Sequence, residues 1–121
     1  MPVTRFSDMP LADRSRRWDG AAAEKRVRKW AGAEDGPNAK YRRAHLWSEA
    51  GKDDEFTGYK LLIADVVNGE LKAVPRGIIA AAAIVDGARG GLNVADADRP
   101  KLRRHLGRYY EKMGETPPWK K

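Results

Sequence analysis

The stretch at 66–87, VVNGELKAVPRGIIAAAAIVDG, predicts a tight β-hairpin that leads directly into a helix. Asn68-Gly69 suits a two-residue hairpin turn, because both central positions of that turn need a positive φ. Pro75 suits the first position of a helix, where its missing N–H costs nothing, and Gly87 suits the position after a helix end. We expect the first strand within 59–67, the second strand at 70–74 and the helix at 76–86.

Two segments upstream of the hairpin carry signals of their own. The alanine-rich segment from Gly20 to Trp30 predicts a helix, with Asp19 as its N-cap and Gly32 as its stop. Residues 40–47 alternate in character, which is typical of an edge strand. Residues 1–17 mix prolines and charges without any period, so we expect a flexible arm there.

The segment from Lys101 to Met113 predicts a third helix, capped by Asp96 or Asp98. Four apolar side chains recur at helical spacing and predict one buried face: Leu102, Leu106, Tyr109 and Met113. Five cations fill most of the other positions and make the opposite face positive: Lys101, Arg103, Arg104, Arg108 and Lys112.

Together these elements predict an α+β fold. We expect a small antiparallel sheet, built from the Asn68-Gly69 hairpin and one edge strand, that packs with three helices. A chain of 121 residues has room for one domain. We place that domain at 18–119, after the arm at 1–17 and before a tail at 120–121.

The composition argues against catalysis, metal binding and membrane insertion. The chain has no cysteine, and its two histidines, His45 and His105, lack a second ligand at metal-binding spacing. None of its serines lies in a nucleophile elbow. No apolar run approaches the roughly 20 residues that cross a bilayer. We therefore expect a non-enzymatic protein without a metal or cofactor and without membrane contact.

The charge balance favours an anionic partner. Lysine and arginine number 24 against 17 acidic residues, which gives a net charge of +7. Such an excess attracts polyanions over long range. The basic face of the last helix is the best candidate surface, with Arg76 nearby and Tyr110 available to stack on a base. The alternatives are a solvated helix face and a tyrosine that is half-buried.

A glycine-rich loop between the last two helices is the second candidate. Arg89, Gly90 and Gly91 would combine a positive charge with backbone amides that can hold an anion. Paired glycines also serve simply to turn the chain where a positive φ is needed. The loop lacks the lysine of a phosphate-binding P-loop, and the sequence has no dinucleotide fingerprint.

The order of these motifs resembles a module of tailed-bacteriophage proteins, found in or beside head-maturation proteases and related virion-assembly proteins. The resemblance covers roughly residues 18–119. It rests on WDGAAAEKRVRKWAG at 18–32, KYRRAHLW at 40–47, the hairpin at 59–69, VPRG at 74–77, GARGG at 87–91, RYY at 108–110 and PPW at 117–119. Leu62 stands where that pattern usually has proline. The serine and histidine of a protease domain are absent, so the resemblance implies an accessory role rather than peptidase activity.

Three functions follow as hypotheses. The first is a module that binds a phage structural or assembly protein during head assembly, in the cytoplasm of a bacterial host or in the virion. The second is binding of DNA or RNA through the basic face of the last helix. A minor third alternative is a host-directed inhibitor.

Overall fold

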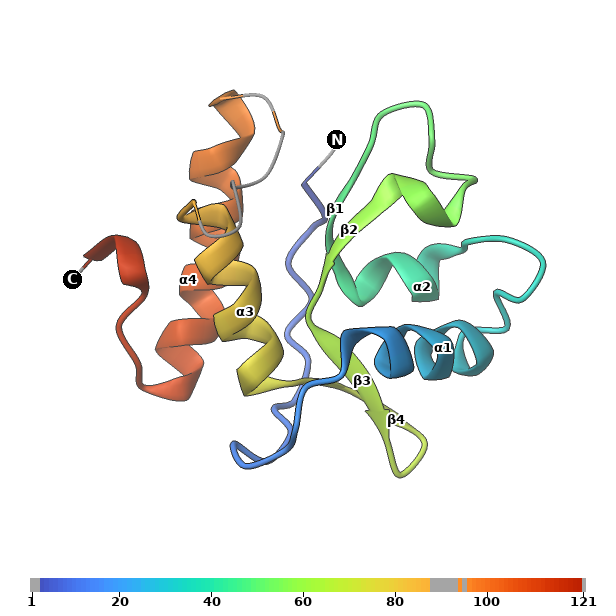
Figure 1. Cartoon of the computed structure of the whole chain (residues 1–121), viewed down its shortest axis with the longest axis horizontal. Coiled ribbons are helices and arrows are strands. Elements are labelled where there is room, and N and C mark those ends of the chain that lie inside the picture. The colour runs from blue at the N-terminus through green and yellow to red at the C-terminus, as the bar shows by residue number, and fades with distance from the viewer. Residues whose placement is uncertain (1–2, 88–93, 95, 121) are drawn as a thin grey trace.

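The computed structural model describes residues 3–87, 94 and 96–120. Within them the helices are α1 (Gly20–Trp30), α2 (Ala39–Arg43), α3 (Pro75–Val85) and α4 (Arg99–Met113), and the strands are β1 (His45–Ser48), β2 (Tyr59–Leu62), β3 (Ala64–Val67) and β4 (Glu70–Ala73). Short 3-10 turns lie at Phe56–Gly58, Asp96–Asp98 and Pro118–Lys120. Helices α3 and α4 form one half of the molecule, and the strands with α1 and α2 form the other (Figure 1). The predicted α+β fold is confirmed.

The predicted hairpin and the helix after it are confirmed. Strands β3 and β4 pair antiparallel, with Val67 opposite Glu70 next to the turn. Asn68 and Gly69 have φ values of 53° and 79°, the two left-handed positions that this turn requires. Helix α3 starts at Pro75 and buries Ile78, Ala81, Ala82 and Val85 along one face.

The predicted edge strand at 40–47 is wrong in its first half. Residues 39–43 form helix α2, and a strand begins only at His45. The side chain of Asn38 caps the helix by accepting a hydrogen bond from the amide of Tyr41 at 2.9 Å. The alternation of 40–47 also fits a helical turn, because Tyr41 and His45 are four residues apart and both face the core.

The first hairpin strand is also divided. Strand β2 pairs with β1, and β3 pairs with β4, so the described residues form two separate two-stranded sheets. Ile63 lies at the junction, where its amide donates to Ala44 and its carbonyl accepts from Val74. Leu61 has a φ of 61°, which interrupts the usual alternation of side chains along a strand.

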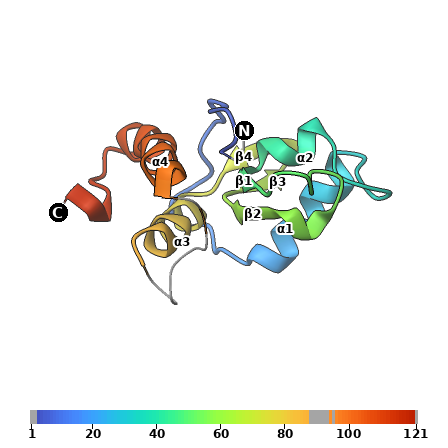
Figure 2. The same ribbon diagram turned by 90° about the horizontal axis from the view of Figure 1, so that it is seen from above.

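Residues 3–12 form a strap between the two halves of the molecule (Figures 1 and 2). The amide of Thr4 donates to Leu46 of β1, and the amide of Ala12 donates to Ala73 of β4, both at 2.8 Å. Met9 in the middle of the strap is 2% exposed. We expected a flexible arm at 1–17, whereas residues 3–12 are paired to both sheets and buried in part.

A buried carboxylate joins α1 to the hairpin of β3 and β4. Asp65 on β3 is 2% exposed and accepts two hydrogen bonds from Arg26 at 2.8 Å and one from Arg16 at 3.1 Å. Burial alone would raise the pKa of Asp65, but the two guanidinium groups outweigh it and hold the pKa below the ordinary value.

Two helical glycines provide a matched pair of variants. A Cβ added to Gly77 of α3 would lie 3.0 Å from ring atoms of Trp18, whereas a Cβ added to Gly107 of α4 would meet nothing within 4 Å. We expect Gly77→Ala to lower the free energy of unfolding by roughly 1 kcal/mol or more, because overpacking costs more than the helix propensity gained. Gly107→Ala should raise it by up to about 1 kcal/mol. Urea denaturation measures both, and equal effects of the two variants would contradict the packing of Trp18 on α3.

Candidate functional site

Helix α4 has the predicted division into a buried and an exposed face. Its apolar side chains are at most 3% exposed: Leu102, Leu106, Tyr109 and Met113. The helix ends at Gly114, whose φ is 72°, and Asp98 is its N-cap residue without a side-chain capping bond. Arg89, Gly90 and Gly91 lie outside the described residues.

The predicted cations of α4 differ in their surroundings. Lys112 donates to a carboxylate oxygen of Asp8 and to the carbonyl of Met9, so its charge already has a partner. The guanidinium of Arg103 lies 5.9 Å from the ring centroid of Trp119. Tyr110 is only 5% exposed and packs edge-on against Trp119, so it cannot stack on a base in this conformation.

Lys101 and Arg104 instead face a groove between α4, α2 and the strap. Its volume is about 810 Å³. Five cations from three segments line it, and we call it the basic groove: Arg5, Arg42, Arg43, Lys101 and Arg104. Its remaining lining residues are small or apolar apart from two hydroxyls: Val3, Thr4, Phe6, Ser7 and Ala39.

Most of these cations lack an acidic neighbour. Arg42 forms an exposed ion pair with Asp53 at 3.4 Å. Arg43 donates to the hydroxyl of Ser7 at 3.2 Å. Across residues 3–87, 94 and 96–120, no carboxylate lies within ion-pair distance of Arg43 or of the groove's three other cations, Arg5, Lys101 and Arg104. Like charges held together without counterions form a site for an external anion.

Sequence reasoning found only part of this site. It identified Lys101 and Arg104, but it missed Arg5, Arg42 and Arg43, because it treated their segments as a flexible arm and a strand. Arg76, also predicted, is exposed on the first turn of α3 and does not line the groove. Had the segment been predicted as a helix, its adjacent arginines, Arg42 and Arg43, would have indicated a second basic surface.

A smaller hollow continues from the groove along α4. It adds His105 and Arg108 to groove residues that include Phe6 and Arg104. The guanidinium of Arg108 lies 3.8 Å from the centroid of the Phe6 ring. His105 packs edge-on against that ring and Tyr109 packs against it at a tilt, with centroid distances of 5.3 Å and 4.9 Å. An exposed arginine therefore lies over an aromatic ring that is packed against two further rings.

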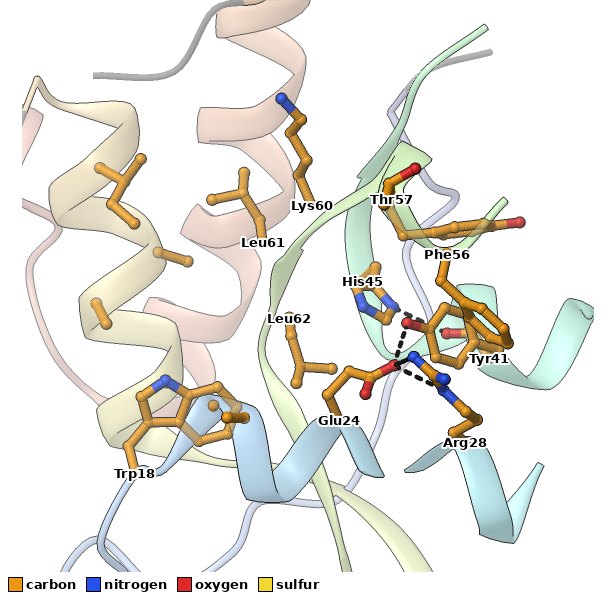
Figure 3. Close-up of a pocket in the computed structure, with 17 residues that line it drawn as sticks. Trp18, Glu24, Arg28, Tyr41, His45, Phe56, Thr57, Lys60, Leu61 and Leu62 are labelled. Carbon is orange, nitrogen blue, oxygen red and sulfur yellow. Dashed lines mark hydrogen bonds and ion pairs between the residues drawn. The ribbon is translucent and has the colours of Figure 1, made fainter. Parts of the chain in front are cut away.

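A second cleft lies between α3, β2 and the start of α1 (Figure 3). It has a volume of about 530 Å³ and mainly apolar walls, to which Trp18, Leu61, Leu62 and Ile84 contribute. The positive φ of Leu61 lets two consecutive leucines line the same cleft.

Three polar side chains of this cleft are hydrogen-bonded to one another: Glu24, Arg28 and Tyr41. Glu24 accepts from the hydroxyl of Tyr41 at 2.7 Å and from Arg28 at 2.6 Å and 3.0 Å (Figure 3). Burial raises the pKa of Glu24, but these donors outweigh it and lower the pKa below its ordinary value. Burial raises the pKa of Tyr41 well above its ordinary value, and the bond to Glu24 adds to that shift. This network ties α1 to α2, and we assign it a structural role.

Comparison with family models, with curated proteins and with solved structures finds no match for this chain. In the part of the chain that the structure describes, no helix combines the length and apolar character of a bilayer span. The same residues contain no cluster of three or more potential metal ligands.

Burial within the fold favours the neutral form of both histidines. Nδ1 of His105 donates to the carbonyl of Thr4 and Nδ1 of His45 to the carbonyl of Tyr41, each at 3.0 Å, since a carbonyl can only accept. Burial lowers the pKa of each histidine to about 4.

We therefore expect stability to fall as the pH drops from 6.5 towards 4. In this window the unfolded chain binds protons at His45 and His105 that the folded chain does not, so the free energy of unfolding is highest above pH 6.5 and declines below it. Calorimetric melting temperatures across this window measure the decline. A His45→Asn/His105→Asn double variant should melt lower but show a flatter dependence on pH. An unchanged slope in that variant would contradict the assignment.

Proposed function

We propose that this chain is a non-enzymatic binding module that holds an anionic polymer in the basic groove. The observation that carries the proposal is the meeting of five cations from the strap, α2 and α4, four of them without a carboxylate partner in the described residues. Keeping these charges together costs free energy through mutual repulsion, and a bound polyanion would remove that cost.

Two kinds of polymer suit the groove. The resemblance to virion-assembly modules suggests an acidic segment of a phage structural or assembly protein, and the net charge of +7 equally suits DNA or RNA. Either would make charge-assisted hydrogen bonds to the arginines, each worth about 1.5–3 kcal/mol. The charges of the groove therefore support binding of an anionic polymer of either kind.

Removing groove charges should weaken binding and its dependence on salt. We expect a variant with Arg43→Gln, Lys101→Gln and Arg104→Gln to bind a fluorescein-labelled 20-residue polyglutamate or a 20-nucleotide oligonucleotide at least tenfold more weakly at low salt. For the oligonucleotide, the slope of log affinity against log salt should fall by roughly 2, since each lost phosphate contact removes about 0.7 from it. Fluorescence anisotropy measures both quantities.

The matched control removes three charges elsewhere. Arg17→Gln, Lys25→Gln and Lys29→Gln change exposed cations that do not line the groove, and give the same net charge. An equal loss of affinity in both triple variants would mean that net charge alone drives binding. Absence of binding to every polyanion at low salt would refute the proposed function.

A further inference from the structure

We infer that the polymer is single-stranded nucleic acid, whose backbone follows the basic groove while one base stacks on Arg108. This inference rests on the proposed function and narrows it to one ligand class. It comes from the placement of the cations, the apolar surface between them and the pairing of Phe6 with Arg108.

Four cations of the groove come from two helices that lie on opposite sides of the strap (Figure 2). Arg42 and Arg43 belong to α2 on one wall, and Lys101 and Arg104 belong to α4 on the other. Two walls of positive charge admit one phosphate chain and neutralise it from both sides. A duplex presents its phosphates on the outside of a wide cylinder, which suits a broad flat or shallow concave basic surface better than a groove between two helices.

The surface between the walls is suited to bases. Val3, Phe6 and Ala39 place apolar atoms inside a groove whose rim is charged. An acidic peptide would find partners for its carboxylates there but would leave this apolar surface uncovered. Every nucleotide carries a phosphate and a flat apolar face, so a single strand satisfies both features of the groove.

Arg108 supplies the stacking platform. Its guanidinium carbon lies over the Phe6 ring, 3.8 Å from the ring centroid, and the residue is exposed. Bases of single-stranded nucleic acids stack on arginine planes as well as on aromatic rings. A base on the outer face of Arg108 would form a third layer over the Phe6 ring, which His105 and Tyr109 already hold in place.

The platform and the groove belong to one continuous surface. Arg104 lines both the basic groove and the hollow that holds Arg108 and Phe6. Arg104 and Arg108 are separated by about one helical turn, or roughly 6 Å along α4. A strand whose phosphate contacts Arg104 can therefore place a neighbouring base on Arg108.

The test compares four fluorescein-labelled probes at low salt: a 12-nucleotide oligothymidylate, an abasic 12-nucleotide strand, a 12-base-pair duplex and a 12-residue polyglutamate. The abasic strand has the same phosphates as the oligothymidylate but no bases. We expect the oligothymidylate to bind about tenfold more tightly than the abasic strand and at least tenfold more tightly than the duplex or the peptide.

Arg108→Lys keeps the charge but removes the flat guanidinium. We expect it to lower oligothymidylate affinity about tenfold and to abolish the difference between that strand and the abasic one. Arg17→Lys makes the same exchange at an exposed arginine outside the groove and should keep the difference. Circular dichroism melting checks that both variants fold. If Arg108→Lys does not fold, the relative affinities of the four probes for the unaltered protein test the inference.

The outcomes separate the two levels of the proposal. Equal or tighter binding of the abasic strand, the duplex or the peptide overturns the inference and leaves the proposed function standing. Failure of all four probes to bind overturns the proposed function, and the inference with it.

Discussion

The structure depends on backbone hydrogen bonds from residues 4–12 to both of its sheets. A two-stranded sheet is marginally stable by itself, and this chain has two of them. The strap donates to Leu46 in one sheet and both accepts from and donates to Ala73 in the other, while Met9 fills the space between them and α4. Each sheet thereby gains a neighbour along part of its edge, and the two halves of the molecule share one apolar core.

Charge is distributed unequally over this framework. On the side of α1, the carboxylates of Asp65 and Glu24 each bind arginine and give those arginines a structural role. In the basic groove the strap, α2 and α4 bring cations together, and the ion pair of Arg42 with Asp53 is the only one that these cations form with a described residue. Within the described residues, four cations without a carboxylate partner therefore meet in one groove, whereas the other unpaired cations do not line it.

The sequence predicted those features of the fold that depend on residues close together in the chain. The turn at Asn68-Gly69, the helix start at Pro75 and the buried stripe of α4 follow from residues close together in the chain, and all three are confirmed. Helix α2 was missed because an alternating segment also fits a helical turn, and the capping bond from Asn38 decides between them. The groove was predicted only on its α4 side, because the strap that carries Arg5 is fixed to α4 by contacts between residues about 100 positions apart, which no local pattern contains.

These distant contacts also constrain the order in which the molecule forms. The strap is the first described part of the chain to be synthesised, yet its partners on α4, Tyr109 and Lys112, are among the last. Contacts that close such long loops form late and slow the folding of small domains. During translation the strap must therefore wait, with Met9 uncovered, until Tyr109 has left the ribosome. The basic groove thus cannot exist on a nascent chain that lacks its C-terminal helix.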